Sequence, residues 1–335
     1  MKPKIIFIER KPSSSVSIER VFRQVAKDLP QEQYDIEFQA APYGNGVFSI
    51  LKNLLWFRRN DGDIYHLTGD VHYLALVLPR AKTILTIHDL VFLRRRTGIR
   101  RAIIKKLFLD LPIWWARHVT TVSEATKREI VENSGMEPES IKVIENPLID
   151  GFRSNSQKIF DTLHPTVLHI GTAENKNLPR LIAAMEGLPC KLRIIGRLDS
   201  SIIEQLSYSE IDFENVSDLD QEQIVAEYGN ADIVSFCSTY EGFGLPIIEA
   251  QAMSKPVITS NLSPMKEVAG YGALVIDPFD AASIRSAIVN AISDPDLRTR
   301  LIAFGLENTK RFEGKRIAEQ YAGIYENIVS EATGL

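Results

Sequence analysis

Several features of secreted and membrane-spanning proteins are scarce or absent in this sequence. Two cysteines, Cys190 and Cys237, are too few for the disulfide framework of a secreted domain. No stretch approaches the roughly 20 apolar residues of a membrane-spanning helix. The apolar run at residues 5–8 is too short for the core of a signal peptide. We therefore expect a cytoplasmic protein with reduced, buried thiols.

Patterns that bind metals or cofactors are absent as well. The sequence has no H-E-x-x-H, no paired C-x-x-C and no Walker A loop, and its six histidines are scattered. The 39 basic and 43 acidic residues give a formal charge of −4, which argues against a nucleic-acid coat. We expect no metal, no cofactor and no nucleic-acid partner.

Short apolar runs alternate with helical patterns along the whole chain. This order is typical of βαβ units and of a parallel sheet covered on both faces, so the fold class is α/β. Strands are predicted at residues 4–8, 35–40, 63–67, 83–87, 118–122, 141–144, 166–170, 191–195, 232–237, 256–259 and 273–276. Helices are predicted at residues 17–29, 99–117, 124–134, 282–292, 296–310 and 315–330.

The 335 residues exceed what one hydrophobic core usually organises, which favours two domains. Residues 151–165 lose all periodicity and collect turn-forming residues, as a linker does. We expect a first domain at residues 1–150, this linker, a second domain at 166–310 and a C-terminal helix at 311–335. Packing of that helix back on the first domain is one arrangement that the pattern allows.

The strongest local signal is the segment at residues 231–252, where an apolar strand enters a glycine-containing turn and a helix begins near Pro246. Gly242 and Gly244 allow a ligand to approach the backbone, and the helix start presents free N–H groups to an anion. Glu241 follows the strand, and Glu249 lies where it can accept hydrogen bonds from ribose hydroxyls. The alternative is a structural turn with two solvated glutamates.

This segment resembles a motif of the GT-B fold retaining glycosyltransferases of family 4, also called group 1. Glu241 and Glu249 match the two acids of the E-x7-E motif, and residues 255–260 match its usual continuation. The resemblance implies that Glu241 contacts the donor sugar and that Glu249 binds the nucleotide ribose. The donor diphosphate and sugar then meet the backbone of four residues: Gly242, Phe243, Gly244 and Leu245.

Residues 169–178 resemble the loop that opens the second domain of the same family. Gly171 and Thr172 belong to this loop, and the resemblance assigns Lys176 to the donor diphosphate. A lysine in a loop is otherwise most often solvated. Many family members carry an arginine just before that lysine, where this chain has Asn175. Arg197 is a candidate for the second cation.

His88 belongs to Thr86-Ile-His-Asp-Leu, which resembles the family loop that directs a histidine toward the donor sugar. A histidine after a strand is otherwise commonly structural. Asp61-Gly-Asp63 fits the D-x-D pattern of a different glycosyltransferase fold, but chance matches are expected among 43 acids. These two acids also precede a strand rather than end one, so a loop is favoured over a metal site.

Residues 94–106 interleave cations with large apolar residues and contain no acid. An amphipathic helix whose apolar side packs on the sheet explains the apolar face. Peripheral contact with an anionic membrane, at the inner face of the plasma membrane, is the hypothesis for the basic face.

The resemblance implies two Rossmann-like domains that face each other across a cleft, the first on the acceptor side and the second binding the nucleotide sugar. It also implies transfer of a sugar from a nucleotide-diphosphate donor to a hydroxyl of a glycan or lipid-linked acceptor. Retention of configuration without a metal, in bacterial surface polysaccharide or lipopolysaccharide synthesis, follows from the same source. A sugar-nucleotide epimerase or hydrolase, and a catalytically silent assembly factor, remain alternatives.

Overall fold

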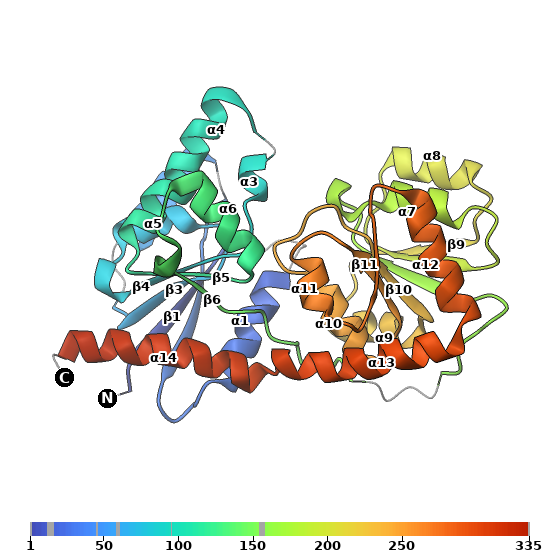
Figure 1. The fold of residues 1–335 in the computed structure, drawn as a ribbon. Helices are drawn as coiled ribbons and strands as arrows, with labels where there is room; N and C mark the ends of the chain where they lie inside the picture. Colours follow the sequence, from blue (N-terminus) through green and yellow to red (C-terminus); the bar gives the residue numbers. More distant parts are fainter. Residues whose placement is uncertain are drawn as a thin grey trace. The chain divides into compact units, whose positions relative to one another are not determined.

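A computed structural model describes residues 2–11, 17–44, 46–57, 61–94, 96–153 and 158–333. The chain divides into two compact units (Figure 1). The first unit holds Met1–Pro147 and Glu313–Leu335, and the second holds Leu148–Phe312. Within the described residues, no helix has both the length and the apolar content needed to cross a membrane.

The first unit contains a six-stranded parallel sheet in the order β2-β1-β3-β4-β5-β6. Its strands are β1 (Lys4–Glu9), β2 (Asp35–Ala40), β3 (Ile64–Leu67), β4 (Thr83–Ile87), β5 (His118–Thr121) and β6 (Ile141–Val143). All six were predicted from their apolar runs. Because successive side chains of a strand point to opposite faces, each strand contributes to two separate cores.

Ile6 and Ile8 of β1 belong to the core on one face of this sheet. That face is covered by α2 (Val47–Phe57), the 3-10 helix η1 (His72–Val77), the π-helical turn η3 (Lys106–Asp110), α5 (Leu111–Trp115) and α6 (Glu124–Ser134). Phe7 points to the other face, where its ring lies 6.0 Å from that of Phe22 and 6.5 Å from that of Tyr325. Helices α1 (Ser17–Asp28) and α14 (Gly314–Thr333) cover this second face.

The C-terminal helix α14 is fastened to the first unit by buried hydrogen bonds. His66 of β3 is fully buried, and its Nδ1 lies 2.8 Å from the hydroxyl of Tyr325. Its Nε2 lies 2.7 Å from Oγ1 of Thr86, which is 2.6 Å from Oγ1 of Thr120. Burial lowers the pKa of His66 to about 3, so the ring is neutral at physiological pH.

The short helix α4 (Gly98–Lys105) precedes η3 and has no buried residue. Ile99 is 80% exposed and Ile103 is 52% exposed. Ile104 of α4 is partly buried and packs against the core on the sheet, as the prediction for the apolar side of this segment requires. Phe108, Leu109 and Ile113, which follow in η3 and α5, belong to the same core. The apolar side chains of α4 are therefore divided between the core and the solvent.

The second unit contains a six-stranded parallel sheet in the order β12-β11-β10-β7-β8-β9. Its strands are β7 (Thr166–Ile170), β8 (Lys191–Ile195), β9 (Phe213–Val216), β10 (Ile233–Phe236), β11 (Val257–Ser260) and β12 (Leu274–Ile276). The sheet grows outward from β7 in one direction and from β10 in the other. The expected α/β class, with two parallel sheets, is confirmed.

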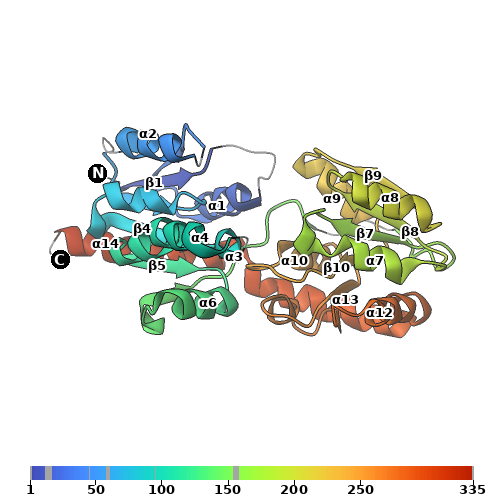
Figure 2. The ribbon, with the colours of Figure 1, turned by 90° about the horizontal axis from the view of Figure 1, so that it is seen from above.

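Helices cover both faces of the second sheet (Figure 2). Helices α7 (Leu178–Met185), α8 (Ser200–Tyr208) and α12 (Ala281–Ser293) share one core with Val167 of β7. The opposite face holds α9 (Gln221–Asn230), α10 (Leu245–Ala252), α11 (Met265–Ala269) and α13 (Pro295–Thr309). Strand β9 was not predicted, because its FENV sequence lies at the sheet edge and is largely exposed.

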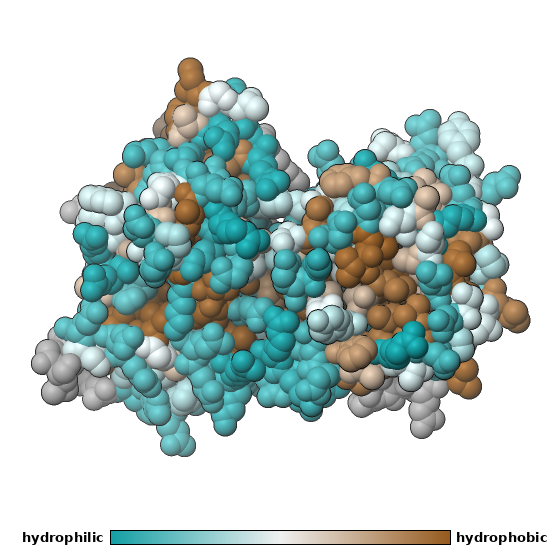
Figure 3. Space-filling model, viewed as in Figure 1, coloured by the Kyte–Doolittle hydropathy of each residue, from teal (hydrophilic) through white to brown (hydrophobic). Residues whose placement is uncertain are grey.

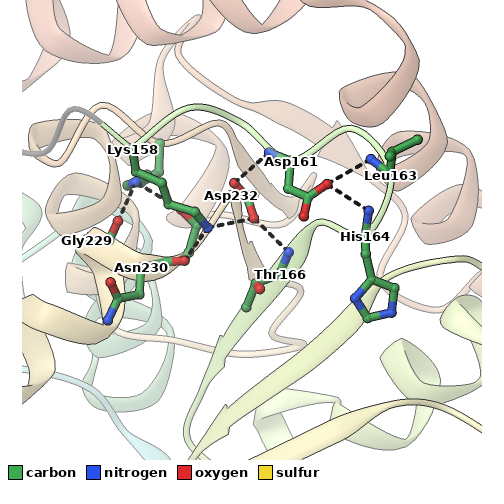
Figure 4. A network of polar contacts seen from close by, with 10 residues as sticks. Lys158, Asp161, Leu163, His164, Thr166, Gly229, Asn230 and Asp232 are labelled. Carbon is green, nitrogen blue, oxygen red and sulfur yellow. Dashed lines mark hydrogen bonds and ion pairs between the residues drawn. The ribbon is translucent and has the colours of Figure 1, made fainter.

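The described part of residues 151–165 belongs to the second unit. Lys158 Nζ lies 2.7 Å from Asp232 Oδ2 and also donates to the carbonyl of Asn230 (Figure 4). Asp232 accepts hydrogen bonds from the backbone N–H groups of Asp161 and Thr166, at 3.2 and 2.8 Å. This buried carboxylate therefore ties the residues before β7 to the start of β10.

Candidate donor-binding site

The predicted site residues of the second unit gather at the carboxyl ends of β7 and β10. These neighbouring strands form the topological switch point of the sheet, where open α/β sheets bind ligands. The loops after the two strands are joined by hydrogen bonds: the Thr239 N–H donates to the Asn175 carbonyl at 2.8 Å, and the Asn177 side chain donates to the Cys237 carbonyl at 3.0 Å. The two loops therefore form one surface.

Lys176 and Glu241, predicted from separate motifs, meet at this point. Lys176 Nζ lies 2.6 Å from Glu241 Oε1, and the side chains are 22% and 14% exposed. The ammonium group also lies 4.8 Å from the centre of the Phe236 ring. A cation and a carboxylate at the switch point provide one group for an anionic ligand and one for sugar hydroxyls.

Asn175 stands where many family members carry an arginine, and it acts here as a connector. Its Nδ2 donates to the Tyr240 carbonyl at 2.9 Å and to Glu241 Oε1 at 3.3 Å. These bonds orient the Glu241 carboxylate from the β7 side, while Lys176 orients it by charge. Asn175 therefore helps to orient the Glu241 carboxylate but adds no positive charge to the site.

Gly171 and Thr172 form the first turn after β7. Gly171 has φ +90°, and a Cβ there would lie 3.0 Å from Lys176 Cε, so glycine lets the lysine side chain pass. The Thr172 hydroxyl donates to the Arg197 carbonyl at 2.7 Å. The Arg197 guanidinium is 75% exposed and forms an ion pair with Asp218 at 2.8 Å. In this structure the candidate second cation therefore interacts with a carboxylate outside the Lys176 loop.

The turn at residues 242–245 opens helix α10. Gly244 has φ +116° and caps the helix without a side-chain hydrogen bond, and Pro246 occupies its first turn. The first N–H groups of α10 are therefore oriented toward the loop. Phe243 is buried, and its ring packs at 5.7 Å and 84° against that of Phe312. Because its side chain is buried, Phe243 can contact a ligand in this turn only through its backbone.

Glu249 lies on the second turn of α10 and is 8% exposed. Its Oε2 accepts a 2.6 Å hydrogen bond from the hydroxyl of Tyr228 on α9. Tyr228 is buried, with its ring edge-on to Phe152 at 5.3 Å. Burial and the Glu249 charge raise the pKa of Tyr228 well above its usual value. Tyr228 was missed in the sequence because nothing in the pattern of α9 distinguishes it.

A second missed residue, His169, lies in β7 below the Lys176 loop. Its side chain is fully buried, and neither ring nitrogen has a hydrogen-bond partner among the described residues. Burial, together with the Lys176 charge, lowers the pKa of His169 to about 4, so the ring is neutral at physiological pH. Only the position of this histidine, two residues before Gly171, could have signalled it.

His88 is the one predicted site residue that belongs to the first unit, where it follows β4. It is 7% exposed, and its Nε2 lies 3.0 Å from the Thr68 carbonyl. Because a carbonyl only accepts hydrogen bonds, Nε2 carries the proton and Nδ1 of the neutral ring is an acceptor. Burial lowers the pKa of His88 to about 4, which keeps this form at neutral pH.

The acids of the D-x-D match hold the start of β1. Lys4 Nζ lies 3.2 Å from Asp61, and the Lys4 N–H donates to Asp63 at 3.0 Å. Among the residues that the structure describes, no group of three or more His, Cys, Asp or Glu side chains is arranged to hold a metal ion.

Comparisons with known proteins agree with this geometry. Residues 153–307 match the family model of the glycosyl transferases group 1, and residues 18–149 match that of glycosyltransferase family 4. The O-antigen chain mannosyltransferase RfbU of Salmonella typhimurium is 26% identical over 259 residues, which cover 73% of this chain and 71% of that protein. The O-antigen chain mannosyltransferase B of Escherichia coli is 31% identical over 171 residues, but these span only 48% of this chain and 45% of that relative.

Solved structures share the fold over nearly the whole chain. A sucrose-phosphate synthase from Thermosynechococcus elongatus superposes with a TM-score of 0.79 at 17% identity, covering 98% of this chain and 100% of that one. HepE from Anabaena, solved in complex with UDP and glucose, gives 0.77 at 16% identity, with 97% and 99% covered. The two family models, the relatives and these folds together place the chain in the GT-B group 1 glycosyltransferases.

Proposed function

We propose that this protein transfers a sugar from a nucleotide-diphosphate donor to a hydroxyl of a glycan or lipid-linked acceptor. The observation that carries the proposal is the Lys176–Glu241 pair at the switch point of the second sheet, beside the N-terminus of α10. Two separate sequence motifs supply these groups, and the fold brings them within 2.6 Å.

Each group has a distinct part in the proposed reaction. The bond between the anomeric carbon and the diphosphate breaks, and the diphosphate leaves with the electron pair. Lys176 and the N–H groups at the start of α10 stabilise the charge that develops on it. A new bond forms from the anomeric carbon to the acceptor oxygen, whose proton is released.

The carboxylates position the donor. Glu241 is held by Asn175 and Lys176 and accepts hydrogen bonds from the donor sugar, while Glu249, held by Tyr228, accepts them from the ribose. His88 contributes a neutral ring toward the donor sugar. The proposed reaction retains the anomeric configuration and uses no metal, since the charge stabilisation comes from Lys176 and the helix terminus.

The relatives named above act on O-antigen chains, and a similar fold occurs in WaaG, a glycosyltransferase involved in lipopolysaccharide biosynthesis. We therefore place the proposed reaction in the synthesis of a bacterial surface polysaccharide. Membrane contact through residues 94–106 is part of the proposal, because Ile99 and Ile103 of α4 face solvent beside exposed cations. Such contact would bring the enzyme to a lipid-linked acceptor.

The test is release of nucleoside diphosphate from a panel of sugar nucleotides, including GDP-mannose and UDP-glucose, in EDTA and with a lipid-linked glycan acceptor. Wild-type protein should release one nucleotide, and the product linkage should keep the donor configuration by NMR. Glu241→Gln should lose this activity, whereas Glu214→Gln, which breaks the pair with Lys191 at the start of β8, should keep it. Equal activity of both variants would contradict the site assignment.

A further inference from the structure

The two charges of the candidate donor site are directed at each other. Lys176 Nζ lies 2.6 Å from Glu241 Oε1, and neither side chain has a second ion-pair partner among the described residues. The cation assigned to the donor diphosphate is therefore already bound by a carboxylate, and the pair has no net charge. A diphosphate that binds Lys176 must compete with Glu241 for the same ammonium group.

The Lys176–Glu241 pair is more buried than an ordinary surface ion pair. Hydrophilic residues cover much of the molecular face drawn in Figure 3. On such a surface water solvates both charges, and ion pairs contribute little. The side chains of Lys176 and Glu241 are only 22% and 14% exposed, so water replaces a lost partner poorly. Breaking this pair without a substitute partner therefore has a substantial free-energy cost.

The Glu241 carboxylate is held from the β7 side as well as by the lysine. Asn175 Nδ2 donates to Glu241 Oε1 at 3.3 Å and to the Tyr240 carbonyl at 2.9 Å. Asn175 is itself fixed, because its carbonyl accepts the Thr239 N–H at 2.8 Å. These hydrogen bonds do not involve Lys176. We therefore expect the carboxylate to keep its place when the ammonium group turns away.

The lysine is the adaptable member of the pair. Its four-carbon stem is flexible, and it passes Gly171, where a Cβ would lie 3.0 Å from Lys176 Cε. The ammonium group also lies 4.8 Å from the centre of the Phe236 ring, a contact that does not depend on Glu241. The ammonium group is therefore the part of the pair that can be redirected toward a phosphate.

A sugar nucleotide and a nucleoside diphosphate affect this pair differently. The sugar brings hydroxyl groups, which donate hydrogen bonds to a carboxylate and so replace the ammonium group as the partner of Glu241. A nucleoside diphosphate brings no such donors. When it takes Lys176, it leaves Glu241 without its cation and beside a second anion, which is unfavourable in a partly buried site.

We propose that the Lys176–Glu241 pair makes the site discriminate between the sugar nucleotide and the nucleoside diphosphate that remains after transfer. While the donor is bound, its sugar hydroxyls bind Glu241 and its diphosphate binds Lys176. After the sugar has left, Glu241 regains Lys176, which weakens the hold on the diphosphate and favours product release. The inference rests on the proposed function and adds to it a role of Glu241 in rejecting the product.

The test is calorimetric titration of wild-type protein and Glu241→Gln with UDP and UDP-glucose, and with GDP and GDP-mannose. Glu241→Gln should bind the preferred nucleoside diphosphate about 10-fold more tightly, because no carboxylate competes for Lys176. Its affinity for the matching sugar nucleotide should stay within about 3-fold of wild type, since the released lysine offsets weaker hydrogen bonds to the sugar. The preference for donor over product should therefore fall.

Three controls show whether the charge of Glu241 causes this effect. Glu214→Gln breaks the 2.8 Å pair with Lys191 in the same unit and should leave both affinities unchanged. Uridine and guanosine, which lack phosphates, should bind Glu241→Gln as they bind wild-type protein. Glu241→Asp keeps the negative charge and should bind the diphosphate more weakly than Glu241→Gln does. An unchanged circular dichroism spectrum shows that each variant is folded, and Glu241→Ala replaces Glu241→Gln if the latter is not.

The outcomes separate this inference from the proposed function. Diphosphate affinity in Glu241→Gln that equals or falls below that of wild type would overturn the inference. In that case a loss of diphosphate affinity in Lys176→Met would still support the donor site. If wild-type protein binds none of the four nucleotides, the proposed function and this inference are both overturned.

Discussion

Replacing Lys176 by methionine removes the positive charge of the proposed donor site while keeping an unbranched side chain of similar length. In the structure this ammonium group is 2.6 Å from Glu241 and partly exposed, so an incoming diphosphate can reach it. A hydrogen bond to a charged group contributes about 1.5–3 kcal/mol. The affinity for a nucleoside diphosphate should therefore fall about 10- to 150-fold.

Isothermal titration with the preferred nucleoside diphosphate and with its nucleoside measures this effect. The loss should appear with the diphosphate and be nearly absent with the nucleoside, because the lysine is assigned to the phosphates alone. Lys191→Met is the control: it breaks a 2.8 Å pair with Glu214 in the same unit, at the start of β8, and should bind as wild type does. Unchanged diphosphate affinity in Lys176→Met, or an equal loss for the nucleoside, would refute the reasoning.

The remaining predictions concern the supports of this site. Tyr228→Phe should lower the free energy of unfolding of the second unit by about 1.5–3 kcal/mol in urea titrations, because Glu249 loses its buried hydrogen-bond donor. The same variant should bind nucleotide more weakly. Full nucleotide affinity would show that Glu249 does not need this hydrogen bond. Gly171→Ala should weaken nucleotide binding more than Gly187→Ala does. Both glycines have positive φ, but only a Cβ at residue 171 would meet a neighbouring atom within 4 Å. Equal losses of nucleotide affinity in the two variants, measured by calorimetric titration, would contradict the steric argument. For His169, the folded pKa of about 4 lies below the ordinary 6.5, so the stability it contributes is present above pH 6.5 and is lost as pH falls through 4. His169→Phe should therefore reduce the acid sensitivity of the second unit by up to about 3 kcal/mol between those pH values, and an unchanged pH profile of unfolding would contradict the buried neutral ring.

The parallel strands were predictable because a strand that is buried on both faces of a sheet has a short, continuous apolar run in its sequence. The two strands of the switch point, at residues 166–170 and 232–237, were placed within one residue of β7 and β10. Ser123 directly precedes the helix predicted at 124–134, and its hydroxyl accepts the Thr126 N–H at 3.1 Å as an N-cap does. Local chemistry determines these features, so one sequence suffices for them.

Features that depend on tertiary partners were not predictable. Helix α2 was missed because its sequence is apolar on both sides: Ile50, Leu54 and Phe57 pack against the core, whereas Phe48 and Leu55 are exposed. Its buried polar residue is Asn53, whose hydrogen-bond partners lie in other parts of the chain. Strand β9 pairs only at the sheet edge, so FENV carries no apolar run. The motifs identified Glu249, but Tyr228 orients it from a different helix, and no spacing in the sequence connects the two.

The most direct test of the donor site is a thermal-shift screen against UDP, GDP, ADP, CMP and dTDP, each in magnesium and in EDTA. A ligand that binds only the native state raises the melting temperature. The account predicts a shift with one nucleoside diphosphate that is equal in magnesium and EDTA and is lost in Lys176→Met. No shift with any of the five in folded protein, or a shift that requires magnesium, would contradict it.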